Sequence, residues 1–148
     1  MGRKVRLQEG ADSKLSLFVD TSVWSLLLRR DAPREVAQVR ALVRALESGE
    51  KIVTTGMVLQ ELLQGFFGAK AHEQIVDRFS ALPLLVPNRE DHVAAAVLRN
   101  LCRKKGIQIG TIDALLAQLC IQHKLAMLTT DDDFVRIAEL TSLKLWKQ

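Results

Sequence analysis

The stretch Leu15-Ser16-Leu17-Phe18-Val19-Asp20 (residues 15–20) decides the fold that we expect for this chain. Its apolar run predicts a short buried strand, and Thr21 and Ser22 directly after it have side chains that begin helices. Four more short apolar runs follow, separated by stretches of helical periodicity. Strands that alternate with helices indicate βαβ units, so we expect an α/β fold with a mostly parallel sheet and helices on both faces.

The apolar periodicity places the individual elements. Strands are expected at residues 15–19, 52–54, 84–86, 126–129 and 143–146. Helices are expected at residues 23–28, 36–49, 55–65, 69–82, 90–105, 112–123 and 134–140. We expect Pro33 near the start of the second helix, Gly106 just beyond the end of the fifth, and Thr111 as the cap of the sixth.

Length and composition indicate one folded domain. The chain has 148 residues, of which 48% are hydrophobic, which is enough for a sizeable core. We expect residues 15–148 to form this domain and residues 1–14 to be a flexible N-terminal lead-in without the apolar segment of a secretory signal. No apolar run approaches the roughly 20 residues of a membrane span, so we expect no membrane partner.

Cysteine content and charge narrow the functional class. Cys102 and Cys120 match no zinc motif, so we expect a reduced, cytoplasmic location. The formal net charge is +4, with basic residues crowded at 29–44 and 99–105. Either cluster alone is best explained as a solvated helix face, but basic clusters around an acidic pocket suggest metals at its centre and phosphates at its rim.

Four acidic residues lie where apolar segments meet polar ones: Asp20, Glu61, Asp113 and Asp131. Asp20 either caps the next helix or stays free because Ser22 is the cap. Glu61, taken alone, is an exposed position on the polar stripe of a helix. Asp113 falls in a first helical turn, where the macrodipole favours a carboxylate. Asp131 begins the acidic run 131–133, of which at least one member is expected to be only a solvated turn residue.

The expected topology gives these acids a reason to meet. Sites in parallel α/β sheets form outside the carboxyl ends of the strands, and Asp20 and Asp131 each follow a strand. Carboxylates beside apolar residues are costly to bury unless a positive group neutralises them, and hard oxygen ligands suit Mg²⁺ or Mn²⁺. We therefore expect a divalent-metal phosphodiesterase, with mutual repulsion raising the pKa of at least one acid when no metal is bound.

Four motifs in this order resemble the PIN-domain ribonucleases, and most closely the VapC-type toxins of bacterial type II toxin–antitoxin systems. They are Val-Asp-Thr-Ser-Val-Trp at 19–24, Leu-Gln-Glu-Leu-Leu-Gln-Gly at 59–65, Asp-Ala-Leu-Leu-Ala at 113–117 and Leu-Thr-Thr-Asp-Asp-Asp-Phe at 128–134. The resemblance spans roughly residues 17–146. It implies a three-layer α/β/α sandwich and a metal-dependent endoribonuclease that hydrolyses RNA phosphodiester bonds as the toxin of a toxin–antitoxin pair.

By motif match, the four acids named above correspond to the family's acidic quartet. The resemblance implies that Asp20, Asp113 and Asp131 bind Mg²⁺ or Mn²⁺, and that Asp133 assists a second ion. It implies that Glu61 orients or deprotonates the attacking water. Thr129 matches a small hydroxyl residue that supports the site, and Asp132 matches a position of no fixed identity.

The resemblance also implies partners: an RNA substrate, a cognate antitoxin that covers the acidic groove, and a second copy of the chain in a homodimer. Arg29, Arg30 and the group at 103–105 are open candidates for RNA contacts. Two other functions stay open, a housekeeping PIN nuclease in RNA processing and a non-catalytic RNA- or protein-binding module. A phosphoacceptor signalling domain is disfavoured, because the third strand is followed by Pro87-Asn88 instead of an aspartate.

Overall fold

A computed structural model describes residues 15–29 and 31–148. The predicted lead-in at 1–14, and Arg30 among the candidate RNA contacts, lie outside the described residues. The five strands are β1 (Leu17–Val19), β2 (Ile52–Thr55), β3 (Leu84–Leu85), β4 (Ala126–Leu128) and β5 (Lys144–Leu145). They form one sheet in the order β3-β2-β1-β4-β5, and every neighbouring pair is parallel.

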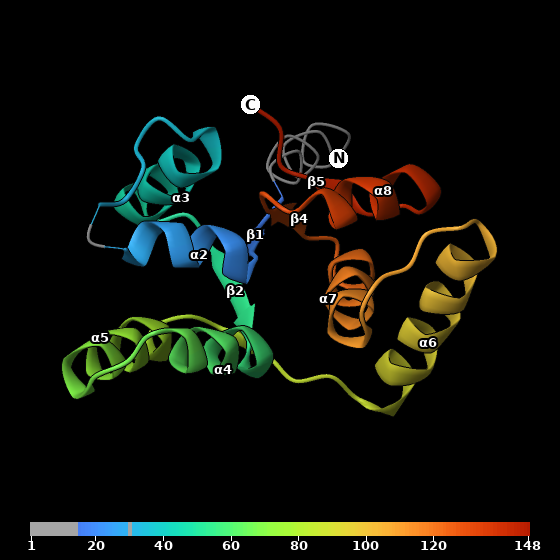
Figure 1. The fold of residues 1–148 in the computed structure, drawn as a ribbon, viewed down its shortest axis with the longest axis horizontal. Coiled ribbons are helices and arrows are strands. Elements are labelled where there is room, and N and C mark those ends of the chain that lie inside the picture. Colours follow the sequence, from blue (N-terminus) through green and yellow to red (C-terminus); the bar gives the residue numbers. More distant parts are fainter. Residues whose placement is uncertain (1–14, 30) are drawn as a thin grey trace, which may run out of the picture.

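Helices cover both faces of this sheet. They are α2 (Thr21–Leu28), α3 (Ala37–Ser48), α4 (Gly56–Gly65), α5 (Ala69–Ser80), α6 (Arg89–Lys104), α7 (Thr111–Gln122) and α8 (Asp132–Leu140). Figure 1 shows α2 and α3 on one side of the sheet, and α7 with α6 outside it on the other. The expected α/β/α sandwich with a parallel central sheet is therefore confirmed.

The order of the strands creates a crevice between β1 and β4. From β1 the chain builds outward through β2 to β3, then crosses to the other side of β1 to add β4 and β5. The register pairs Val19 with Leu128, the last residues of the two strands. The residues that follow these strands therefore lie side by side at the point where the strand order reverses, which is where α/β sheets place their ligand sites.

The interior is built from the strands and from the apolar faces of the helices. Phe18, Val19, Met127 and Leu128 on the two central strands are almost fully buried, as expected for a parallel sheet covered on both faces. Both cysteines are free and buried, and burial raises the pKa of each thiol, in accord with a packing role. Among the described helices, none has the length and apolar character needed to cross a membrane.

Several helix starts differ from the sequence predictions. For α2, where the sequence left two caps open, the N-cap is Asp20 and not Ser22. The predicted cap of α7 was wrong: Gly110 is the N-cap and Thr111 is already the first helical residue. Pro33 precedes the start of α3 at Ala37 by several residues, so it lies in the turn and not in the helix. Gly106 does follow α6 with a φ of 83°, the left-handed conformation that glycine adopts without strain.

Candidate metal centre

Asp20 is fixed at the end of β1 by two hydroxyl groups, one from Ser22 on α2 and one from Thr129 directly after β4. Its Oδ2 accepts hydrogen bonds from Ser22 Oγ at 2.8 Å and from Thr129 Oγ1 at 2.9 Å, and a longer one from the Ser22 amide at 3.4 Å. The side chain is only 6% exposed. One carboxylate oxygen is therefore held by the protein, and Oδ1 is the oxygen that these bonds do not engage.

The end of β4 is tied to the same network. Thr129 Oγ1 accepts a hydrogen bond from the Asp131 amide at 2.9 Å, and Ser22 Oγ accepts one from the Thr130 amide at 3.1 Å. The hydroxyls of Ser22 and Thr129 thus bridge the carboxylate after β1 and the backbone after β4. This bridging gives Thr129 the supporting position that its motif implies.

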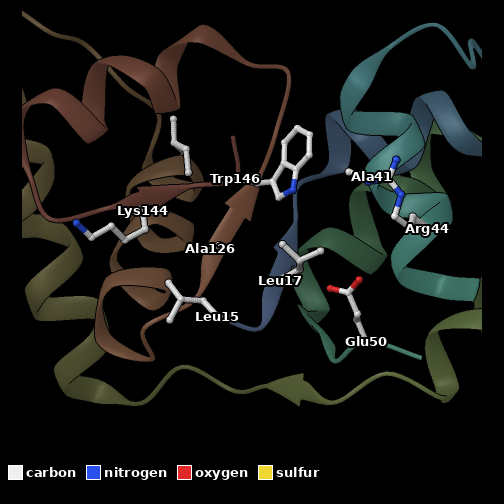
Figure 2. A pocket seen from close by; sticks show the side chains of 9 residues that line it. Leu15, Leu17, Ala41, Arg44, Glu50, Ala126, Lys144 and Trp146 are labelled. Atoms are coloured by element: carbon white, nitrogen blue, oxygen red, sulfur yellow. The ribbon is translucent and has the colours of Figure 1, made fainter. Parts of the chain in front are cut away.

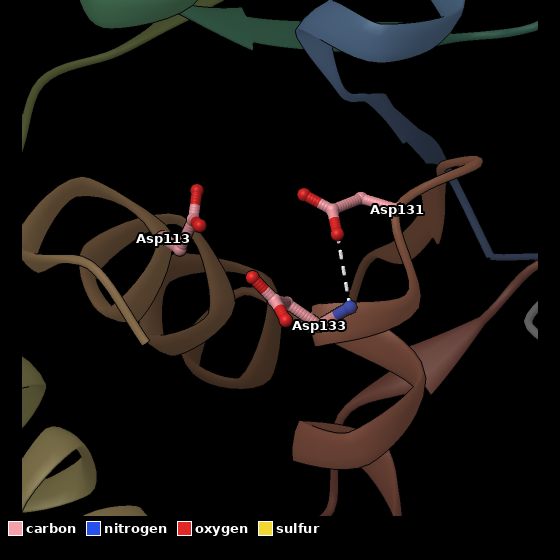
Figure 3. A group of neighbouring side chains, drawn as sticks. All are labelled: Asp113, Asp131 and Asp133. Carbon is pink, nitrogen blue, oxygen red and sulfur yellow. Dashed lines mark hydrogen bonds between the residues drawn. The ribbon is translucent and has the colours of Figure 1, made fainter. Parts of the chain in front are cut away.

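Three carboxylates converge beside this network. One oxygen each from Asp113, Asp131 and Asp133 lies within 4.8 Å of the other two. Figure 3 shows Asp113 on α7 facing Asp131 and Asp133 at the start of α8. Asp131 is the N-cap of α8, and its Oδ1 accepts the Asp133 amide at 2.9 Å. Asp132, between them, is exposed.

The pKa of Asp113 is raised by its burial and by the negative charges around it. Burial is the largest cause that raises its pKa, followed by repulsion from Asp20, Asp131, Asp133 and Glu61, and the pKa moves from 3.8 to about 6. Asp113 lies in the first turn of α7, where the helix dipole favours the ionised form. Burial and repulsion therefore outweigh the dipole, and the expectation of a raised pKa among the clustered acids is confirmed for this residue.

Glu61 lies on α4, the helix that follows β2, whereas the three converging carboxylates lie on α7 and at the start of α8. Its Oε1 accepts a hydrogen bond of 2.8 Å from Thr21 Oγ1, the residue directly after Asp20. Glu61 itself is exposed, and it contributes to the repulsion felt by Asp113. An exposed carboxylate held in one orientation is suited to contact water or substrate at the rim of the acidic group.

One cation is already present at the cluster. Arg136 on α8 forms an ion pair with Asp133 through Nη2 and Oδ1, one helical turn further along. The guanidinium is half exposed, so it neutralises part of the negative charge from the solvent side. Asp133 therefore has a charged partner for one oxygen, whereas the recorded partner of Asp131 is the backbone amide of Asp133.

The donor set is suitable for a hard divalent cation. In an octahedral Mg²⁺ site with ligand distances of about 2.1 Å, adjacent oxygens stand about 3.0 Å apart and opposite ones about 4.2 Å. Carboxylate oxygens within 4.8 Å of one another therefore need to close by up to about 2 Å. The pKa of Asp113 is raised by burial first and by repulsion from the other carboxylates second, and a bound cation would offset both. Oxygen-only ligands without cysteine or histidine are typical of Mg²⁺ or Mn²⁺ sites and not of zinc sites.

The structure brings all five predicted site residues to one region. Asp113, Asp131 and Asp133 form the converging group, while Asp20 and Glu61 lie close enough to perturb Asp113 but outside that group. Sequence reasoning assigned no site role to Ser22, Thr21 or Arg136. Each carried a signal nonetheless: the two hydroxyl residues directly follow a strand-end aspartate, and Arg136 has the i, i+3 spacing from Asp133 that pairs opposite charges on a helix.

A separate hollow lies at the opposite end of the sheet. A cavity of about 510 Å³ is lined by the first residues of β1, β4 and β5, namely Leu17, Ala126 and Lys144. Figure 2 shows Trp146 and Arg44 at its sides and one carboxylate, from Glu50. Because it sits at the amino ends of the strands and has a largely apolar lining, it is not part of the acidic centre.

The fold and the site together define a class: a parallel α/β sandwich with clustered carboxylates at the switch point of its sheet. The chain belongs to the PIN domain family, whose sequence profile matches residues 17–140. Ribonuclease VapC11 of Mycobacterium tuberculosis is 29% identical over 130 residues, which cover 86% of this chain and 96% of that protein. VapC ribonuclease Mb1587 of Mycobacterium bovis matches to the same extent.

Solved structures of similar fold include proteins from Rickettsia felis and Mycobacterium tuberculosis. VapBC2 from Rickettsia felis, bound to a DNA fragment from its promoter, has a TM-score of 0.70 at 20% identity, covering 89% of this chain and 98% of that one. VapC20 of Mycobacterium tuberculosis, described as a toxin that cleaves the sarcin–ricin loop, has a TM-score of 0.61 at 20% identity, covering 81% and 93%. At these identities the likeness establishes the fold.

Proposed function

We propose that this chain is a metal-dependent endoribonuclease that hydrolyses RNA phosphodiester bonds and acts as the toxin of a toxin–antitoxin pair. The convergence of Asp113, Asp131 and Asp133 carries this proposal, since three carboxylate oxygens within 4.8 Å of one another are the type of ligand that Mg²⁺ and Mn²⁺ prefer. The ribonuclease relatives in Mycobacterium support the substrate class, and the VapBC complexes among the structural neighbours support an antitoxin partner.

Each acid has a distinct task in this proposal. Asp113 and Asp131 hold the ion, Asp20 contributes Oδ1 directly or through water, and Asp133 assists a second ion once Arg136 releases it. A bound divalent ion would acidify a water molecule and neutralise the charge that develops on the phosphate. Glu61, oriented by Thr21, positions the attacking water or takes its proton.

The bond changes follow from attack in line with the leaving group. The water oxygen bonds to phosphorus while the bond from phosphorus to the 3′ oxygen breaks, and the 3′ oxygen takes a proton. The products are a 5′-phosphate and a 3′-hydroxyl. A single-stranded or looped RNA suits this site, because its phosphates can approach an open cluster at the protein surface.

The proposed partners follow from the charge of the centre. An antitoxin segment that places an Arg or Lys side chain over the carboxylates would occupy the position of the metal and so inhibit the enzyme. Arg136 on Asp133 is an example within the chain of a guanidinium bound to one of these carboxylates. We also infer that the chain forms a homodimer in the cytoplasm, where its two free cysteines would stay reduced.

Cleavage of end-labelled RNA tests the catalytic proposal. Wild-type protein with Mn²⁺ should cut the RNA, a chelator should stop it, and Asp113→Asn and Asp131→Asn should each lower the rate by about a hundredfold or more. Asp132→Asn is the matched control, because it removes an exposed carboxylate between two site residues. Cleavage that is indifferent to the chelator would show that the mechanism is wrong.

Expression in a bacterial host separates the toxin from a housekeeping nuclease. A toxin should arrest growth, and co-expression of a small protein encoded beside its gene should relieve the arrest. The Asp113→Asn variant should be harmless at the same level of expression. A wild-type chain that cleaves RNA without slowing growth would favour a role in RNA processing.

A further inference from the structure

A hollow between α6 and the first turn of α7 lies next to the acidic centre. It has a volume of about 230 Å³ and is lined by residues of α6 and by Thr111, the first residue of α7. Asp113 belongs to the same turn and faces the other converging carboxylates (Figure 3). A Cβ atom placed on Gly110, directly before Thr111, would stand 4.0 Å from Asp113 Oδ2. The start of α7 therefore separates the hollow from the acidic centre by little more than its own width.

The size and lining of the hollow suit a single planar ring. Four of its lining residues are alanines or leucine, and the polar groups come from His92, Arg99, Asn100 and Thr111. Small apolar side chains leave room for a flat ring, and a histidine ring stacks on nucleobases. The volume is below the roughly 300–1,000 Å³ of pockets that enclose a whole drug-sized ligand. The hollow therefore has room for one ring system of a larger molecule.

The polar groups of the hollow are mainly hydrogen-bond donors. Arg99 Nε donates to the carbonyl of Ile109 at 2.8 Å, which orients the guanidinium without engaging its Nη groups. Asn100 Oδ1 accepts from Arg103 Nη2 at 3.1 Å, so the amide nitrogen is the group of Asn100 that is left to donate. No carboxylate lines the hollow, and among the described residues neither arginine takes part in a recorded ion pair. A ring with two acceptors on one edge matches this arrangement.

A second, smaller hollow continues from the first along α6. It has a volume of about 100 Å³, and Arg99 lines both hollows, with Arg103 and Gln108 further along the second. The spacing of four residues places the two arginines on the same face of the helix. Guanidinium groups bind phosphate oxygens through paired N–H donors. The two hollows together thus offer a place for a ring and, beside it, a cationic place for a phosphate.

We propose that the first hollow binds one guanine base of the RNA substrate, beside the phosphate that is cut, and that Arg103 binds a neighbouring phosphate. Guanine presents N7 and O6 as two acceptors on one edge, whereas adenine and cytosine present an amino donor there and uracil a single acceptor. A phosphate alone would satisfy the donors but would leave the apolar walls without a partner. This inference rests on the proposed ribonuclease function and deepens it, because it names what the same site selects in its substrate.

Binding of labelled RNA hexamers tests the assignment without any cleavage. Fluorescence anisotropy, with a chelator present, compares hexauridine with the same hexamer carrying one guanosine at its third position. Wild type should bind the guanosine hexamer about tenfold more tightly, as expected for one paired contact to N7 and O6. Asn100→Ala removes a donor and Ala96→Trp fills the hollow, so each should bind both hexamers alike. Arg99 is left in place, because its bond to Ile109 fixes the chain that enters α7.

Matched variants separate the pocket from general attraction to a cationic surface. Arg103→Gln should weaken the binding of both hexamers by several-fold and retain the preference, since phosphate contacts carry no sequence information. Lys104→Gln removes the next cation, which is exposed and lines neither hollow, and Ala69→Trp places the same ring at an exposed position of α5. Both controls should keep the tenfold preference, and circular dichroism should confirm that every variant folds. A wild type without preference for guanosine, or a preference that survives Ala96→Trp, would overturn the proposal.

Mapping of the cut sites distinguishes this proposal from the proposed function. With Mn²⁺, wild type should cut at a fixed distance from a guanosine, and Ala96→Trp should raise KM with little change in kcat. Cleavage at positions unrelated to guanosine would overturn the base pocket and leave the nuclease standing. A preference for guanosine in binding without any cleavage would overturn the nuclease and leave the pocket standing.

Discussion

Replacing Asp113 by asparagine should stabilise the metal-free protein. Burial and four neighbouring carboxylates raise the pKa of Asp113 from 3.8 to about 6, so the folded state holds the ionised form at a cost. A shift of about two pKa units corresponds to about 3 kcal/mol at 1.36 kcal/mol per unit. The side chain is only partly buried, so solvent screening reduces this to about 1–2 kcal/mol. For a domain of this size the melting temperature should rise by about 3–8 °C.

The effect should depend on pH with a defined sign. Because the pKa of Asp113 is raised in the folded state, the folded protein binds a proton more tightly than the unfolded protein does. The stability that this proton contributes is fully present below about pH 4. That stability is lost as the pH rises through about 6. The variant should therefore match wild type near pH 4, exceed it increasingly up to about pH 6–7, and keep a constant advantage above that.

Thermal unfolding followed by circular dichroism between pH 4 and 8, in the presence of a chelator, measures both effects. Addition of Mn²⁺ at pH 7.5 should raise the melting temperature of wild type and leave that of Asp113→Asn almost unchanged. Asp132→Asn controls for the loss of one negative charge and should follow wild type. A variant less stable than wild type at pH 7.5 without metal, or a stability difference that does not change with pH, would refute the reasoning.

Three further predictions concern the groups around the metal centre and one remote cap. Thr21→Val removes the hydrogen-bond donor that orients Glu61 and should slow single-turnover RNA cleavage by about tenfold. Glu61→Gln should slow the same reaction by about a hundredfold. Equal rates for Thr21→Val and wild type would contradict the role of Thr21. Arg136→Gln frees Asp133 and should bind Mn²⁺ several-fold more tightly by isothermal titration calorimetry, with weaker binding as the contrary result. Asn88→Ala breaks the capping box of α6 and should cost about 1 kcal/mol in urea unfolding, with RNA cleavage unchanged.

The sequence predicts those parts of the site that depend on strand ends. Asp20 and Asp131 each follow a short apolar run, and parallel topology alone predicts that they meet. Glu61 and Asp113 lie within helices, where local pattern favours ordinary surface and first-turn residues. Only the order of four motifs connected them to the site, and the geometry of α4 and α7 then brought them to the same region.

The hydrogen bonds that hold the site together could not be predicted from local sequence patterns. Thr21 and Glu61 are 40 positions apart, and Thr129 reaches Asp20 across 109 positions, so neither bond has a sequence signature of its own. The start of α7 was misplaced for a related reason. A hydroxyl residue before a helix is the usual cap, but here the chain enters α7 from Gly110, whose extended backbone lets Thr111 begin the helix.

The acidic centre follows from where three helices begin. Asp20 caps α2, Asp131 caps α8, and Asp113 lies in the first turn of α7, so each carboxylate sits at the positive end of a helix dipole. These dipoles make it possible to gather carboxylates at one edge of a sheet without unfolding the domain. The pKa of Asp113 is nonetheless raised, by burial first and by repulsion from four other carboxylates second, so the dipoles do not offset both effects. The charge that remains is the physical reason to expect a divalent cation, because an ion there would replace repulsion by coordination.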